Sequence, residues 1–178
     1  MKCDHHGDFS KSDRKVIYDI NTHGWHVMIV SPDGANPGWA YSIGLFHTFR
    51  HPEILIFGLD GDLMHQLINH VGQGARDGAR IEPERDYGDI LERYRCMFRP
   101  VKTSWYPHVL GYATWFYKGS AFPALQLFWP DKSQRYPWDP DFEARFLGDQ
   151  PLLFQAGSDE ARARYLLATP SRGPEVPQ

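Results

Sequence analysis

The sequence predicts an α+β domain whose sheet is mostly antiparallel and curved, or small and split-barrel-like, with helices on its flanks. Two observations predict this class. Three strand-like stretches follow one another with short links in the first third of the chain, which favours an antiparallel meander. Helical and strand-like stretches then alternate, and Gly and Pro near their ends favour curvature. The 178 residues, of which 42% are hydrophobic, suffice for a buried core without disulfides or metals.

The first predicted helix begins after Ser12, which can cap it, and ends at Gly24. Residues 25–30 then alternate so that both faces of a strand carry apolar groups. We therefore expect this strand to be covered on both sides and His26 to be partly buried. The apolar side chains on one face of the helix are Val16, Ile17 and Ile20.

A hairpin loop is predicted over residues 31–38, which are dense in Pro, Gly, Asn and Asp. A second strand follows over 39–46, and a connector over 47–52 leads to a third strand over 53–59. The β-branched and aromatic side chains of this third strand suit a central position in the sheet.

A second helix is predicted after a cap at Asp60 or Asp62, and Gly72 and Gly74 are expected to end it. Its spacing of apolar residues is that of a helix packed against a sheet. The apolar stripe comprises Leu63, Met64, Leu67, Ile68 and Val71.

The second half of the chain has weaker signals. Residues 76–93 show no strong period and predict an irregular surface segment with one helical turn, followed by a strand over 95–105. Residues 106–119 predict a helix with Pro at its first position, and residues 122–129 predict a further strand. A short amphipathic helix is expected beyond Gly157.

This order of predicted elements divides the chain into three parts. Residues 1–11 are polar and predict a flexible N-terminal tail, and residues 12–157 predict a single α+β domain. Residues 158–178 predict a short C-terminal helix and a Pro-rich, disordered tail.

Composition argues against several classes of partner. The formal net charge of -3 supplies no positive field for phosphate backbones, so we expect no nucleic acid. The apolar runs are far shorter than the roughly 20 residues a bilayer requires, so we expect no membrane span. Two cysteines and the lack of a secretory apolar region favour a cytoplasmic location. The oligomeric state does not follow from the sequence.

Two pairs of histidines invite a metal hypothesis. His65 and His70 share one predicted helix, but their spacing puts them about 140° apart around its axis, too far to share an ion. His47 and His51 have the spacing of helical zinc ligands, yet they lie in a predicted connector without the Glu of a zincin motif. An extended connector would hold them roughly 13 Å apart. We therefore assign no metal site.

Other chemical motifs are few. Cys3, His5 and His6 can supply thiolate and imidazole ligands to zinc, or belong to a frayed terminus. Neither a Gly-x-Ser-x-Gly elbow nor a Cys-x-x-Cys pair occurs, and Cys96 falls in a strand pattern typical of a buried, inert thiol. No glycine-rich loop precedes a helix in the manner of a phosphate-binding site.

Aromatic and histidine side chains from separate stretches form the candidate ligand-binding site. Aromatic walls with a few polar groups suit a flat heterocycle or a partner's side chain, although a Trp-rich core would give the same pattern. The candidate ligand-binding residues are Trp39, Tyr41, His47, His51, Trp105, Tyr106, His108 and Trp115.

Several short motifs resemble a bacterial family catalogued as a domain of unknown function, DUF4262. The resemblance covers residues 16–153 and implies a family without implying an activity. The motifs are GWHV at 24–27, WAYSIGL at 39–45, HPE at 51–53, FGL at 57–59 and FPALQLFWPD at 122–131.

A weaker resemblance, at the level of fold, is to flavin-binding split barrels, in which a strand ending in a Gly-Leu turn precedes a second strand and a helix. This resemblance implies a flavin as a possible cofactor. Ser42, Thr48, Arg50 and Lys102 would be the groups available to its phosphate.

The leading functional hypothesis is therefore a small-ligand-binding domain, of the flavin-type split-barrel kind. An alternative is a non-catalytic protein-interaction module, such as an immunity or accessory protein, with a protein partner in place of the small molecule. A further alternative is a metal-dependent hydrolase that uses the connector histidines and Glu53. Whether the chain is an enzyme stays open.

Overall fold

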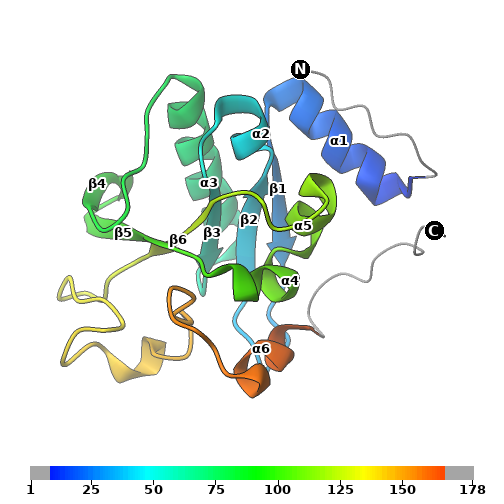
Figure 1. Cartoon of the computed structure of the whole chain (residues 1–178). Helices are drawn as coiled ribbons and strands as arrows, with labels where there is room; N and C mark the ends of the chain where they lie inside the picture. The colour runs from blue at the N-terminus through cyan, green and yellow to red at the C-terminus, as the bar shows by residue number, and fades with distance from the viewer. Residues whose placement is uncertain (1–8, 167–178) are drawn as a thin grey trace.

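The computed structural model describes residues 9–166. These residues form a six-stranded mixed sheet with helices on both faces (Figure 1). The strand order is β1-β2-β3-β6-β5-β4. The strands are β1 (His26–Val30), β2 (Trp39–Ile43), β3 (Glu53–Phe57), β4 (Asp86–Leu91), β5 (Tyr94–Pro100) and β6 (Ala124–Phe128). The helices are α1 (Lys11–His23), α2 (Leu45–Phe49), α3 (Gly61–Arg76), α4 (Tyr106–Val109), α5 (Gly111–Tyr117) and α6 (Asp159–Leu166), with 3₁₀ turns η1 (Thr103–Trp105) and η2 (Ala144–Phe146).

The prediction of a mostly antiparallel α+β sheet is confirmed. Every neighbouring pair is antiparallel except β3 and β6, which are parallel. The predicted meander corresponds to β1, β2 and β3. In the described residues β1 and β4 are the two edges of an open sheet, so the barrel-like detail is not confirmed.

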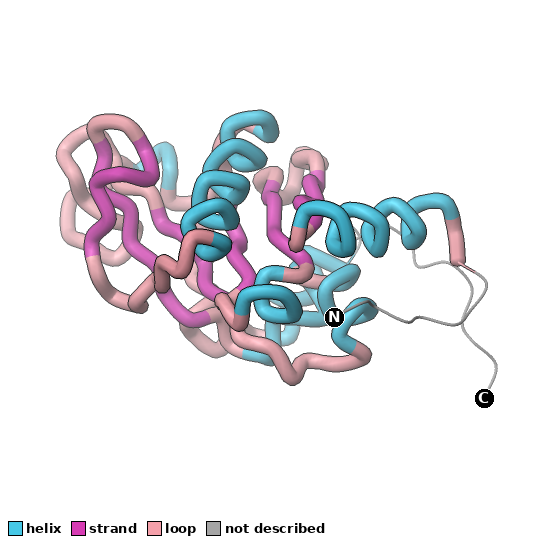
Figure 2. Tube along the Cα trace, turned by 90° about the horizontal axis from the view of Figure 1, so that it is seen from above, coloured by secondary structure: helices cyan, strands magenta, loops and turns pink. Residues whose placement is uncertain are grey.

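Two hydrophobic cores lie on opposite faces of the sheet, because successive side chains of a strand point to opposite sides. Trp39, Tyr41 and Phe57 face α1, α4, α5 and α6, whereas Ile54 and Ile56 face α3. Figure 2 shows the strands as a twisted row with helices on either side. All five residues of β2 and of β3 are buried, as expected for central strands. None of the described helices combines the length and hydropathy needed to cross a bilayer.

The cap of the N-terminal helix lies two residues before the predicted cap, Ser12. Ser10 caps α1 in a capping box with Asp13, and Gly24 ends the helix in the left-handed conformation, as predicted. His26 is partly buried, also as predicted. The expected cover on both faces of β1 is incomplete, because this strand is an edge and Ile29 is 41% exposed.

The predicted boundary between the second strand, over 39–46, and the connector, over 47–52, is wrong. β2 ends at Ile43, and α2 then forms one helical turn. Gly44 precedes this turn with φ 108, a conformation that favours glycine. The first amides of α2 are bound by a carboxylate from β3, an interaction between distant residues that local sequence patterns do not reveal.

Helix α3 confirms the cap at Asp60, whose side chain accepts hydrogen bonds from the amides of Asp62 and Leu63. The predicted end at Gly72 and Gly74 is wrong, because α3 continues to Arg76. Both glycines lie inside the helix.

Several predictions for the second half are corrected. The segment predicted as irregular over 76–93 contains β4, whose exposed, charged residues lack the alternation of a buried strand. The strand predicted over 95–105 ends at Pro100, and the helix predicted over 106–119 is divided into α4 and α5 at Leu110. The expected strand over 122–129 is β6, and the expected C-terminal helix is α6. Cys3, His5 and His6, for which the sequence leaves zinc binding or a frayed terminus open, lie outside the described residues, as does the predicted C-terminal tail.

Candidate functional site

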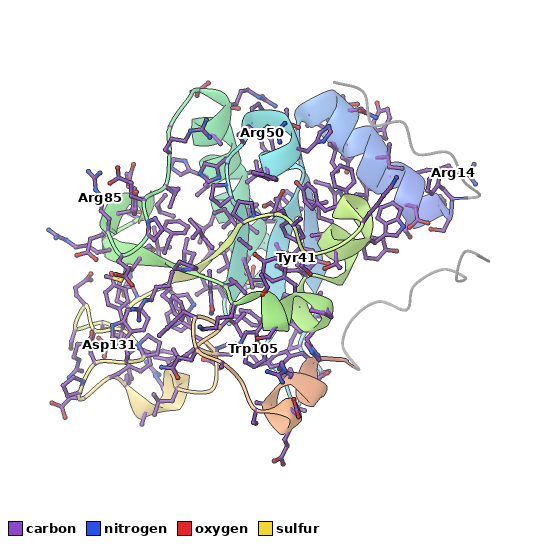
Figure 3. All side chains as sticks on the ribbon, in the orientation of Figure 1. Arg14, Tyr41, Arg50, Arg85, Trp105 and Asp131 are labelled. Carbon is purple, nitrogen blue, oxygen red and sulfur yellow. The ribbon has the colours of Figure 1, made fainter. Side chains whose placement is uncertain are left out.

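The predicted aromatic residues lie together in the core on one face of the sheet. Trp39, Tyr41, Trp105 and Tyr106 are buried there, and Trp115 packs against them from the rim. The Trp39 ring stacks on Phe57 with centroids 5.5 Å apart, and Tyr165 of α6 contacts both Trp39 and Trp105. Figure 3 labels Tyr41 and Trp105 within this core.

The polar groups of these rings bind backbone atoms of the chain itself. Trp39 Nε1 donates to the Val109 carbonyl at 3.0 Å, and Trp105 Nε1 donates to the Gln155 carbonyl at 2.9 Å. Tyr106 Oη donates to the Phe122 carbonyl at 3.0 Å, and burial raises the pKa of Tyr106 to about 12. These bonds satisfy the buried donors and help to hold α4 on the sheet.

The predicted histidines come from separate elements. His47 lies on α2 with its ring edge against Phe116, and His51 is buried, with Nδ1 2.8 Å from the Pro52 carbonyl oxygen. His108 lies on α4. Burial lowers the pKa of both His51 and His108, so both rings favour the neutral form. A ligand-binding role for the aromatic and histidine residues stays a prediction.

Glu53 is the centre of a buried polar network at the start of α2. Its Oε1 accepts hydrogen bonds from the Gly44 amide at 2.9 Å, the Phe46 amide at 3.1 Å and the Tyr117 hydroxyl. Its Oε2 accepts from Ser42 Oγ at 2.5 Å. The carboxyl group thus joins β2, β3, α2 and α5.

The network leads to a prediction of how the stability of the protein depends on pH. Burial raises the pKa of Glu53 above its ordinary value of 4.5, so folded Glu53 keeps its proton at a pH where the unfolded chain has lost it. The contribution of Glu53 to stability is therefore full below pH 4.5 and falls as the pH rises through the folded pKa. We expect the free energy of unfolding of the wild type, minus that of Glu53→Gln, to decrease over this range in urea titrations. A difference that is constant or rises with pH would contradict the prediction.

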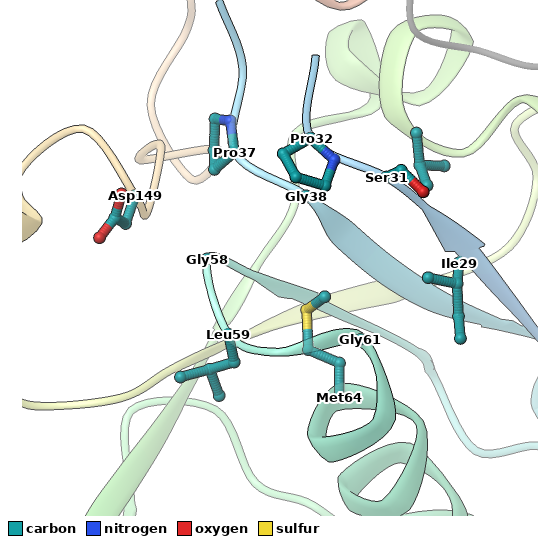
Figure 4. Close-up of a pocket in the computed structure, with 11 residues that line it drawn as sticks. Ile29, Ser31, Pro32, Pro37, Gly38, Gly58, Leu59, Gly61, Met64 and Asp149 are labelled. Carbon is teal, nitrogen blue, oxygen red and sulfur yellow. The ribbon is translucent and has the colours of Figure 1, made fainter. Parts of the chain in front are cut away.

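A pocket of about 350 Å³ opens at the opposite end of β2 from this network. It lies between the loop that joins β1 to β2, the turn from β3 into α3, and residues near Asp149, and none of the predicted site residues lines it. Figure 4 shows Pro32 and Pro37 on one side and Leu59 and Met64 on the other. Within the described part of the chain, no group of at least three His, Cys, Asp or Glu side chains is arranged to hold a metal ion.

The loop wall of the pocket is fixed by its own hydrogen bonds. Asp33 Oδ1 accepts from the amides of Ala35 and Asn36 at 3.0 and 2.8 Å, which closes an Asx-type turn between the two prolines. The Gly38 carbonyl then accepts from the Gly58 amide at 2.9 Å and ties this loop to the end of β3. These hydrogen bonds hold the loop wall in place in the absence of a ligand.

The opposite wall depends on one glycine. Gly58 has φ 73, and a Cβ added there would lie 2.6 Å from the carbonyl oxygen of Asp149. Only glycine satisfies both the backbone conformation and this close approach. The chain then turns at Asp60 into α3, so Leu59 and Met64 are presented to the pocket.

Two glutamines hold the segment that contains Asp149. Gln150 pairs through its side-chain amide with both backbone groups of Trp129, at 3.0 and 2.9 Å. Gln126 of β6 donates to the Pro151 carbonyl at 2.8 Å and accepts from the Leu153 amide at 3.3 Å. These bonds substitute for a strand ladder and keep an irregular segment against the sheet.

Sequence reasoning identified the elements around this pocket but not the pocket. The sequence predicts a hairpin loop over residues 31–38, and it places the FGL motif at 57–59 in the last residues of the third strand. Their common signal is Gly and Pro at the adjacent ends of neighbouring strands, where the backbone leaves room that side chains do not fill.

Comparisons with known proteins give one match. A family model described as "Domain of unknown function (DUF4262)" matches residues 19–143, which include β1 through β6. No curated protein and no solved structure matches the chain.

Proposed function

The chain belongs to the DUF4262 family of domains of unknown function, and we propose that it binds a small, largely apolar ligand between the β1–β2 loop and the start of α3. The observation that carries this proposal is the pocket of about 350 Å³. Its volume lies within the roughly 300–1,000 Å³ range of small-molecule sites. It is therefore large enough for a ligand with one ring.

The walls of the pocket support the same function. Apolar side chains of Ile29, Pro32, Leu59 and Met64 supply contact area. Hydrogen bonds within the chain already hold both walls, so binding need not order them, and preorganisation of this kind favours affinity.

An NMR titration with 2-phenylethanol tests the proposal. A ligand of this size bound in an apolar pocket should have a Kd of about 1 mM. We expect it to shift the amide resonances of Gly38, Gly58 and Gly61. Ile29→Trp places an indole at the exposed rim of the pocket and should weaken binding roughly tenfold by filling it.

The matched control is Tyr18→Trp, which places an indole on exposed α1, away from the pocket residues. This variant should bind 2-phenylethanol like the wild type. Saturable shifts confined to other parts of the chain, or equal binding by Ile29→Trp, would overturn the proposal.

The flavin ligand stays a prediction, and riboflavin added to the same samples tests it through quenching of its fluorescence. The interaction-module and metal-dependent hydrolase hypotheses also stay predictions. The pocket favours the small-ligand hypothesis over both, because neither alternative requires a largely apolar hollow of about 350 Å³.

A further inference from the structure

The charged residues in the segments that line the pocket are all acidic. Residues 29–38, 58–64 and 147–151, which contain most of the lining, include no Lys, Arg or His. The charged residues in these ranges are Asp33, Asp60, Asp62 and Asp149.

Two of these carboxylates already have partners in the chain. Asp33 accepts hydrogen bonds within its loop, which lower its pKa and keep it ionised. Asp60 accepts from the amides of Asp62 and Leu63 at the start of α3. The helix terminus, which would otherwise attract an anion, is thus occupied by a carboxylate of this chain.

Asp149 is the acidic residue that lines the pocket, and its carboxylate differs from those of Asp33 and Asp60 in its surroundings. Its carboxylate makes no hydrogen bond or ion pair with any residue in the described range 9–166, and burial raises its pKa. Figure 4 shows Asp149 at the end of the pocket opposite Ile29, with its carboxylate turned away from the other labelled residues. Since this group has no partner to lose, rotation about its Cα–Cβ bond toward a bound cation breaks no contact.

We propose that the ligand of this pocket is a small organic amine bound in its ammonium form. This inference rests on the proposed function. The apolar body of the amine lies between Pro32 and Met64, and the ammonium group lies toward Asp149. Charge-assisted hydrogen bonding to Asp149 compensates for the partial burial of that carboxylate.

Three probes with the same phenyl and ethylene groups test the charge preference. They are 2-phenylethylamine, 2-phenylethanol and 3-phenylpropionate, titrated by NMR as above. We expect the amine to bind about fivefold more tightly than the alcohol, and the carboxylate to bind more weakly than the alcohol. The advantage of the amine should shrink as sodium chloride is raised.

Asp149→Asn separates the carboxylate from the shape of the pocket. This variant should reduce the preference for the amine to about twofold or less and leave the alcohol unchanged. Asp89→Asn, an exposed position on β4 at the other edge of the sheet, is the matched control and should keep the full preference.

The outcomes separate this inference from the proposed function. Equal binding of amine and alcohol in the pocket, or tighter binding of the carboxylate, overturns the amine inference and leaves ligand binding intact. Failure of every probe to shift the pocket amides of the wild type overturns both. An amine preference that survives Asp149→Asn overturns the role of Asp149.

Discussion

Glu53→Ala is expected to lower the free energy of unfolding by about 4 kcal/mol, since each buried donor left without its acceptor costs about 1–3 kcal/mol. The donors that lose their acceptor are the amides of Gly44 and Phe46 and the hydroxyls of Ser42 and Tyr117. The truncated side chain also leaves a cavity in a fully buried position. Urea denaturation followed by circular dichroism measures the change.

Glu92→Ala is the matched control, because the Glu92 side chain is 89% exposed. Its effect should stay within about 0.5 kcal/mol, as is usual for surface substitutions. Glu53→Gln keeps one carbonyl acceptor and should be milder than Glu53→Ala. A loss below about 1 kcal/mol in Glu53→Ala would show that the network contributes no more than one ordinary hydrogen bond.

Gly72→Ala is expected to lower the free energy of unfolding by about 1–3 kcal/mol, as overpacking of a core does. A Cβ at this position would lie 2.6 Å from the ring of Trp25, closer than real side chains approach. Trp25 cannot move freely, because its Nε1 donates to Asn69 Oδ1 at 2.8 Å and Arg76 lies over its ring. The substitution therefore forces α3 away from β1.

Gly74→Ala, the same substitution two residues later, provides the control. At Gly74 the nearest atom to an added Cβ is 3.6 Å away, an ordinary contact. Gly74→Ala should therefore stabilise the protein by about 0.5–1 kcal/mol through helix propensity. Thermal unfolding and Trp fluorescence of both variants measure the contrast. Equal effects of the two substitutions would contradict the close packing of Gly72 on Trp25.

Local interactions explain which elements could be predicted. Gly24 and Asp60 act within a few residues of their helix ends, so composition and spacing were sufficient to place them. The sequence also contains the signal for the correct first cap, because Ser10 and Asp13 have the spacing of a capping box. Ser12 has no acidic residue at the same spacing.

Distant interactions explain which elements could not be predicted. The first turn of α2 is held by Glu53 from the following strand, and Gly72 remains helical because the ring of Trp25 occupies the space beside it. Neither partner is near in sequence, so the pattern at α2 resembled a strand and a connector, and Gly72 resembled a stop signal.

The candidate site could not be predicted in full for the same reason. Aromatic content indicated where large rings would gather, but not whether they would surround a space. The carbonyls of Val109 and Gln155 that bind Trp39 and Trp105 come from distant segments, and these bonds help to close the core. The pocket instead lies where Gly38 and Gly58, which have no side chains, stand at adjoining strand ends.

The single parallel pair, β3 with β6, affects how the protein is made. Because the ribosome synthesises the chain from its N-terminus, β1, β2 and β3 can assemble while one side of the very apolar β3 still lacks its neighbour. That side stays open until residues 124–128 have been translated and have left the exit tunnel. During this interval the EILIF stretch of β3 is an unpaired edge of the kind that joins other chains, and pairing with β6 removes this edge.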